Sequence, residues 1–145
     1  MLFVSRPSCI KRLLVIEDDP LVAFDNERTL KHAGYDVIAT VDSGEAAVAL
    51  LASEQVDALV LDLGLAGHMT GRDVARIARD RGIAVLLVTG LCPEDAGDIA
   101  LACLHKPHSA SALVSALHAI ETMICKNKQP RKVGGLQTYW RPEAA

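Results

Sequence analysis

The sequence predicts an α/β fold, in which short parallel strands alternate with helices. Two observations carry this prediction. Short apolar runs recur along the chain, as is typical of strands that are buried on both faces of a parallel sheet. Between most of these runs lie segments whose apolar residues repeat at helical spacing, and whose ends carry capping residues, proline or glycine. Such alternation implies right-handed crossovers and helices on both faces of the sheet.

Three strands and two helices are expected in the first half of the chain. They are, in order, a strand at Leu13–Ile16, a helix at Leu21–Ala33, a strand at Tyr35–Thr40, a helix at Glu45–Ala52 and a strand at Ala58–Leu61. Pro20 suits the first turn of the first helix and Gly34 its end, while Ser43 can cap the second helix. The third strand ends in a single carboxylate, Asp62, which is expected at the edge of the sheet.

The second half of the chain is expected to continue the alternation with one irregularity. The expected elements are a loop at Gly64–Gly71, a helix at Arg72–Arg81, a strand at Ala84–Val88, a strand at Ile99–Leu104 and a last helix from about Ser109 to about Lys126. Between the last two strands, Leu91–Gly97 contains Pro93 and has room for little more than one helical turn. Five strands are therefore expected.

Length and composition favour a single globular domain. A chain of 145 residues, half of them hydrophobic, can bury one sizeable core. We expect this domain at residues 11–126, after an N-terminal extension at residues 1–10. Residues 127–145 are basic and rich in proline and glycine, and we expect them to form a flexible tail. Tyr139 and Trp140 leave open that this tail docks onto a partner.

The charge and aromatic content argue against nucleic-acid binding. Five of the 15 lysines and arginines, but only one of the 18 acidic residues, lie in residues 126–145, so the body of the protein is acidic. Aromatic residues make up only 3% of the chain, which leaves few platforms for stacking on bases. No direct DNA binding is therefore expected.

The sequence also favours a cytoplasmic protein without membrane contact. No apolar run approaches the roughly 20 residues that cross a bilayer, and the N-terminus lacks the order of charged, apolar and cleavage regions of a signal peptide. The four cysteines, which are Cys9, Cys92, Cys103 and Cys125, are scattered without metal-ligand spacing. We expect them to be reduced and mainly structural.

Polar residues follow four of the five predicted strands at the point where each strand ends. They are Glu17 and Asp18 after the first strand, Asp62 after the third, Thr89 after the fourth and Lys106 after the fifth. The carboxyl ends of parallel strands line one edge of the sheet, where such folds bind ligands. Clustered carboxylates repel one another unless a cation such as Mg²⁺ bridges them, and a hydroxyl and an ammonium beside that cation are donors for a phosphoryl group.

These residues resemble the motif set of the receiver domains of bacterial two-component response regulators. The resemblance covers about Lys11–Lys126 and includes the acidic pair in VIEDDP, Asp62 in VLDL, Thr89 in VTG and Lys106 in KP. It implies a flavodoxin-like, doubly wound fold with five parallel strands in the order 2-1-3-4-5.

The resemblance also implies roles for these residues. Asp62 would accept a phosphoryl group, whose oxygens Thr89 and Lys106 would contact. Mg²⁺ would be bound by Asp18, Asp62 and the backbone carbonyl of Gly64, with Glu17 acting through water. Cys92 lies near this proposed site, where it is a candidate for oxidation.

The sequence departs from the family pattern in the region between Thr89 and Lys106. Cys103 stands where receivers have an aromatic switch residue, three positions before the lysine. Thr89 and Lys106 are a few residues closer than is usual, so we expect the fourth helix to be short or missing. With the LVTG stretch and the glycine-rich loop GHMTG, this spacing resembles single-domain receivers with a FATG-type motif.

The function implied by the resemblance is that of a signalling switch or phosphate shuttle. The expected partners are a sensor histidine kinase or histidine phosphotransfer protein and an unidentified downstream protein, and the chain is expected to be a monomer or homodimer. Leu21–Ala33 and the loop after Lys106 are the expected docking surface. Because the 19 residues after the last helix cannot form an output domain, a stand-alone receiver is expected.

Two other functions stay open. The first is a small phosphatase or phosphotransferase that uses Asp62 as a turnover nucleophile. Such an enzyme needs a general acid two residues further on, where Gly64 stands, so we expect a phospho-acceptor rather than an enzyme. The second is a receiver-like module that binds partners without being phosphorylated, and intact Mg²⁺ binding would argue against it.

Overall fold

Six strands form one sheet in the computed structural model, which describes residues 9–143. The strands are β1 (Arg12–Ile16), β2 (Asp36–Val41), β3 (Ala58–Asp62), β4 (Ala84–Thr89), β5 (Ala102–His105) and β6 (Leu136–Thr138), in the order β2-β1-β3-β4-β5-β6. Strands β1 to β5 are parallel, and β6 is antiparallel to β5. The parallel order 2-1-3-4-5 is thus present as predicted, whereas the predicted total of five strands is wrong.

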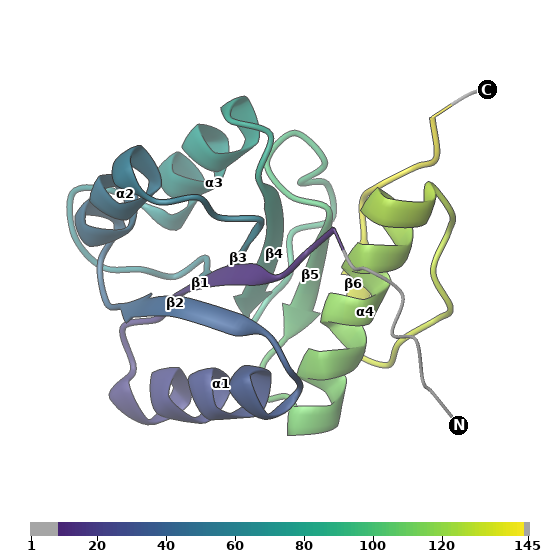
Figure 1. Cartoon of the computed structure of the whole chain (residues 1–145), viewed down its shortest axis with the longest axis horizontal. Helices are drawn as coiled ribbons and strands as arrows, with labels where there is room; N and C mark the ends of the chain where they lie inside the picture. The colour runs from purple at the N-terminus through teal and green to yellow at the C-terminus, as the bar shows by residue number, and fades with distance from the viewer. Residues whose placement is uncertain (1–8, 144–145) are drawn as a thin grey trace.

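Two pairs of helices cover the two faces of the sheet. The helices are α1 (Pro20–His32), α2 (Gly44–Ser53), α3 (Gly71–Asp80) and α4 (Ala110–Lys126). Helices α1 and α4 lie on one face and α2 and α3 on the other (Figure 1). Alternate residues of β1 divide between the two cores, since Leu13 packs on the α1 and α4 side and Leu14 on the α2 and α3 side.

The helix starts follow from local capping. Asp19 accepts hydrogen bonds from the amides of Leu21 and Val22 at the start of α1, and the Ser43 hydroxyl accepts one from the amide of Ala46 in α2. Helix α3 begins one residue earlier than predicted, because Thr70 and Asp73 form a reciprocal capping box. These caps fix where the loops that follow β1 and β3 end.

No helix lies between β4 and β5 in the described part of the chain, which confirms the prediction of a short or missing helix there. Instead, the amides of Ile99 and Ala100 both donate to the carbonyl oxygen of Ala96, which forms a single turn. This turn also explains why β5 begins at Ala102, later than the predicted start at Ile99.

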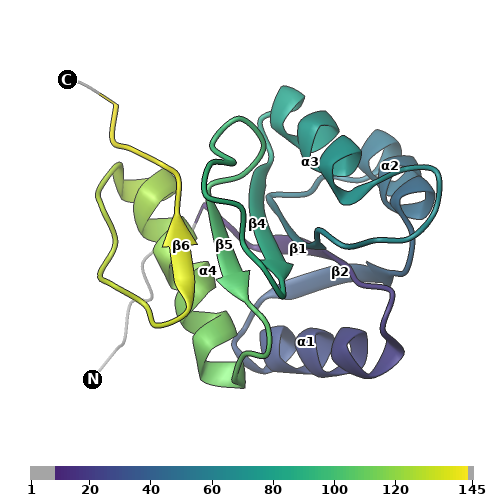
Figure 2. The same cartoon turned by 180° about the vertical axis from the view of Figure 1, so that it is seen from behind.

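The tail predicted to be flexible is instead attached to the body of the protein. Strand β6 lies beside β5 and runs in the opposite direction (Figure 2). The amide of His105 donates to the carbonyl oxygen of Gly135 at 2.9 Å, and the Tyr139 hydroxyl donates to the carbonyl oxygen of Pro93 at 2.5 Å. Trp140 packs against the core on the α1 and α4 side. The expectation of a flexible tail is therefore wrong for the segment around β6.

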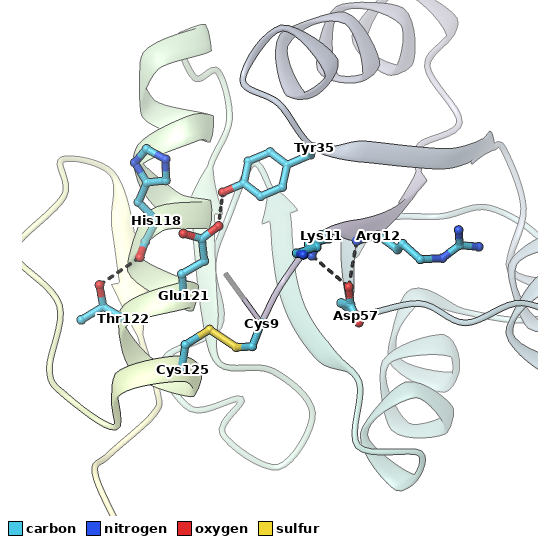
Figure 3. The surroundings of a disulfide bond; sticks show 9 residues. All are labelled: Cys9, Lys11, Arg12, Tyr35, Asp57, His118, Glu121, Thr122 and Cys125. Carbon is cyan, nitrogen blue, oxygen red and sulfur yellow. Dashed lines mark hydrogen bonds between the residues drawn. A yellow bond between two sulfur atoms is a disulfide. The ribbon is translucent and has the colours of Figure 1, made fainter. Parts of the chain in front are cut away.

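The expectation of four reduced cysteines is also wrong, because the structure contains two disulfides. Cys9 is bonded to Cys125 and Cys92 to Cys103, each with 5.8 Å between the Cα atoms. Figure 3 shows that the first bond joins the segment before β1 to the end of α4. The same helix also accepts a hydrogen bond at Glu121 from the hydroxyl of Tyr35. Cys9 and Cys125 are 116 residues apart, so the fold and not the local sequence pairs them.

Between residues 9 and 143, none of the helices combines the length and the apolar character that a membrane span requires.

Removal of residues 134–145 is expected to uncover the outer edge of β5. The amide of His105 then loses its acceptor and exchanges with solvent about tenfold faster or more, since an unpaired edge opens at little cost. The amide of Lys106 donates to the carbonyl oxygen of Thr89 on β4 and serves as an internal control. Amide hydrogen exchange followed by NMR tests this, and unchanged exchange at His105 would show that β6 does not protect the edge.

Candidate functional site

Three acidic side chains meet at the carboxyl edge of the sheet. Glu17 and Asp18 follow β1, and Asp62 ends β3; because Ile16 and Leu61 are partners in the parallel register, the two strand ends lie side by side. One carboxylate oxygen from each of the three residues lies within 4.8 Å of the others. Glu17 and Asp62 are only 3% and 8% exposed, whereas Asp18 faces solvent. The predicted acidic cluster is thus assembled by neighbouring strands.

Lys106 supplies the positive charge of this cluster. Its Nζ lies 2.5 Å from Oε1 of Glu17 and 3.5 Å from Oδ2 of Asp62. Lys106 follows β5, so its side chain crosses the ends of β4 and β3 to reach the acid after β1. The lysine therefore joins elements from both halves of the chain.

Thr89 and Gly64 lie at the same edge. Thr89 is the last residue of β4, one position after the partner of Asp62 in the register, and its carbonyl oxygen accepts a hydrogen bond from the amide of Lys106 at 2.8 Å. The amide of Gly64 donates to Oδ1 of Asp62 at 2.9 Å. All of the predicted site residues thus gather at one edge, while the predicted metal contact of the Gly64 carbonyl stays a prediction.

Burial and charge act differently on the two buried carboxyl groups. Burial raises the pKa of Glu17 to about 7, because its effect and that of Asp62 exceed the lowering by Lys106. Burial also opposes ionisation of Asp62, but hydrogen bonds with Glu17, the amide of Gly64 and Lys106 hold its pKa below the ordinary value. Desolvation would lower the pKa of Lys106, yet the two acids raise it. Asp62 and Lys106 are therefore charged at neutral pH, and Glu17 is the first of the two acids to take up a proton as the pH falls.

One residue that supports Asp62 is not apparent from the sequence motifs. Gly71 begins α3, and a Cβ atom at this position would lie 2.7 Å from the carbonyl oxygen of Leu63 and 2.9 Å from that of Asp62. Only glycine lets the start of α3 approach the backbone of Asp62 this closely. The signal in the sequence is the Thr70-Gly71 pair, where a helix cap is followed by a residue without a side chain.

The donor set fits a magnesium ion. Mg²⁺ prefers carboxylate oxygens and commonly keeps several of its waters, and Glu17, Asp18 and Asp62 offer three such groups around one point. Asp18 is exposed, which leaves a side of the cluster open for water and for a ligand. A cation bound at this cluster would favour the ionised form of Glu17, because carboxylate ligands are deprotonated.

The chain belongs to the family of response regulator receiver domains. The family model matches residues 13–118, which lie within the domain predicted at residues 11–126. The transcriptional regulatory protein PdtaR of Mycobacterium tuberculosis is 30% identical over 113 residues, which cover 74% of this chain and 55% of the relative. The DNA-binding response regulator MtrA of Mycolicibacterium smegmatis is 35% identical over 80 residues, which cover 54% of this chain and 34% of the relative. The chain thus spans about half, or less, of the length of these relatives.

Solved receiver structures share the fold. A CheY-like response regulator receiver domain protein from Methanospirillum hungatei JF-1 superposes with a TM-score of 0.73, at 21% identity, over 82% of this chain and 99% of that chain. The chemotaxis response regulator CheY4 of Vibrio cholerae gives a TM-score of 0.68 at 23% identity, over 75% of this chain and 97% of that chain. The likeness to FATG-type receivers is not tested by these comparisons and stays a prediction.

In the metal-free protein, Glu17 is expected to titrate with a midpoint near pH 7 instead of near 4.5. Lys106 lowers the pKa of Glu17, so Lys106→Met is expected to move the midpoint about one pH unit higher. Lys128→Met, the same change at an exposed lysine, is the control and leaves the midpoint in place. Carbon NMR of the side-chain carboxyl groups measures both values, and a midpoint near 4.5 in the unmodified protein would contradict the assignment.

Proposed function

We propose that this chain is a phosphorylatable receiver that takes a phosphoryl group from a phosphohistidine onto Asp62. The observation that supports this most directly is the setting of Asp62, which is buried with Nζ of Lys106 at 3.5 Å and the amide of Gly64 at 2.9 Å, two groups that favour its ionised form. A buried carboxylate that stays charged beside a lysine can act as a nucleophile toward phosphorus.

The proposed step forms one bond and breaks one. An oxygen of Asp62 attacks the phosphorus atom, the bond between phosphorus and the histidine nitrogen breaks, and the imidazole leaves with the bonding electron pair. The product is an acyl phosphate on Asp62. The ammonium of Lys106 and the hydroxyl of Thr89 donate hydrogen bonds to the phosphoryl oxygens. Mg²⁺ bound by Asp18, Asp62 and the backbone carbonyl of Gly64, with Glu17 acting through water, would supply positive charge that offsets the charge of the phosphoryl group.

Phosphorylation would change the partner of Lys106. Its Nζ now lies 1.0 Å closer to Glu17 than to Asp62, at 2.5 and 3.5 Å. A phosphoryl group on Asp62 adds negative charge beside the same ammonium, which favours movement of Lys106 from Glu17 toward the phosphoryl oxygens. Lys106 begins the connection from β5 to α4, so movement of its side chain would also shift the backbone at this edge of the sheet.

The proposed phosphodonors are a sensor histidine kinase or a histidine phosphotransfer protein. The start of α1 offers an apolar docking surface, since Leu21 and Phe24 are 77% and 60% exposed. A groove between α1 and the loop after Lys106, lined by Val22, Asn26 and Pro107 among others, continues this surface toward the site. The proposed partners place the reaction in the cytoplasm.

Incubation with Mg²⁺ and acetyl phosphate is expected to add one phosphoryl group that is stable in acid and labile in base. Asp62→Asn is expected to abolish the labelling, because the amide is not a nucleophile toward phosphorus. Thr89→Ala is expected to slow it about tenfold or more, since one donor to the phosphoryl oxygens is lost. Intact mass spectrometry measures the fraction labelled over time.

Asp80→Asn, the same change at an exposed position at the end of α3, is the matched control and is expected to label normally. Labelling that persists in Asp62→Asn would contradict the assignment of Asp62. Continuous release of phosphate from phosphate esters would instead support an enzyme with Asp62 as a turnover nucleophile.

A further inference from the structure

The disulfide between Cys92 and Cys103 joins the two strand ends that carry Thr89 and Lys106. Cys92 lies three residues after Thr89, in the loop that follows β4, and Cys103 lies three residues before Lys106, within β5. In the sheet, Cys103 is the register partner of Leu87 on β4, two residues before Thr89, so the bond runs from the loop after β4 back to β5 near the acidic edge. The two groups proposed to contact the phosphoryl oxygens are thus connected through a covalent link.

The bond occupies the place where a helix is missing. Cys92, Ala96, Ile99 and Cys103 belong to the core on the α2 and α3 side, and they fill this face with a turn instead of a helix. Such a segment has few hydrogen bonds of its own, so a covalent bond at its start and end restricts it strongly.

We propose that Cys92 and Cys103 form a redox-sensitive pair that controls the freedom of the loop after Thr89 and thereby gates phosphorylation of Asp62. The gate rests on the function proposed above for Asp62, whereas the pairing of the two thiols does not. The oxidant class is a hydroperoxide, and the reductant class is a small dithiol. In a reducing compartment such a bond forms transiently, as a signal of oxidation.

Exposure determines the order of the chemical steps. Cys92 is 7% exposed and Cys103 is fully buried, so the Cys92 thiolate is the sulfur that a peroxide reaches. With hydrogen peroxide as the oxidant, it attacks one peroxide oxygen, the O–O bond breaks, and protonation of the leaving oxygen gives water and a sulfenic acid on Cys92. The Cys103 sulfur then attacks the Cys92 sulfur and displaces a second water, and the disulfide forms with two electrons passed to the peroxide. A dithiol reverses the reaction by thiol–disulfide exchange and becomes a disulfide itself.

Opening of the bond is expected to loosen the loop without unfolding it. The tail still holds this segment, because the Tyr139 hydroxyl donates to the carbonyl oxygen of Pro93 and the Gln137 amide group donates to that of Glu94. The reduced form can therefore let Thr89 move toward a phosphoryl group on Asp62, whereas the oxidised form restrains it. We expect the reduced form to be phosphorylated faster.

The second disulfide is a control that the protein itself provides. Cys9 precedes β1 and therefore lies at the amino edge of the parallel sheet (Figure 3), whereas Asp62 ends β3 at the carboxyl edge. Cys9 and Cys125 are both exposed, so oxidants and reductants reach this bond at least as easily as the buried one. Its redox state is expected to leave the phosphorylation rate unchanged.

The experiment compares phosphorylation rates in defined redox states. The full chain is oxidised with hydrogen peroxide or reduced with dithiothreitol, and differential alkylation with peptide mass spectrometry assigns the state of each cysteine pair. The initial rate of labelling by acetyl phosphate with Mg²⁺ is then measured. The variants are Cys92→Ser, which leaves the buried Cys103 in place, and the double variant Cys9→Ser/Cys125→Ser as the matched control. Cys103→Ala is a second route to the open form, and thermal denaturation reports whether each variant is folded.

The unmodified chain and the Cys9→Ser/Cys125→Ser variant are expected to label about fivefold faster or more when reduced, a typical size for coupling between sites. Cys92→Ser and Cys103→Ala are expected to label at the fast rate in both conditions. Equal rates in the unmodified chain, with alkylation proving that the Cys92 and Cys103 pair has opened and closed, would overturn the gate alone. Failure of the pair to form with peroxide would overturn the redox assignment, and absence of labelling in every state would overturn the proposed function of Asp62.

Discussion

The ion pair between Lys106 and Glu17 is the interaction on which the carboxyl edge of the sheet depends. It brings a cation from β5 across two intervening strands to an acid that follows β1, and it lies beside Asp62 at the end of β3. Buried carboxylates repel one another, so without this lysine or a bound cation the two strand ends would carry an uncompensated charge. Parallel pairing of β1 to β5 is what puts all of these groups within reach.

The same lysine also connects the site to the unusual half of the fold. Its amide is bonded to the carbonyl oxygen of Thr89, so the segment between them begins and ends at the site. That segment contains a turn instead of a helix, and it is held by a disulfide and by the tail. The segment next to the acidic edge is therefore held in place by a disulfide and by the C-terminal residues. A packed helix and an aromatic residue at position 103 are both absent from it.

Prediction from the sequence succeeds where a local pattern determines the structure. The buried run before Asp62 locates β3, and the parallel order of strands then collects Asp18, Thr89 and Lys106 at one edge. Prediction fails where the structure depends on pairing between segments that are far apart in the sequence. Strand β6 has only three residues and no apolar alternation, and Cys9 pairs with a cysteine 116 residues away. The direct contact of Lys106 with Glu17 depends on the reach of one side chain across two strands, which no spacing in the sequence reports.

The short antiparallel strand at the end of the sheet has a consequence for solubility. Residues 102–104 of β5 are fully buried or nearly so, and an open edge made of such apolar residues would be a template for pairing with other chains. With β6 in place, the outermost strand is only three residues long and is flanked by basic residues, among them Arg131 and Lys132 before it and Arg141 after it. Short edge strands beside positive charges resist edge-to-edge association, so the basic tail protects this side of the sheet against aggregation.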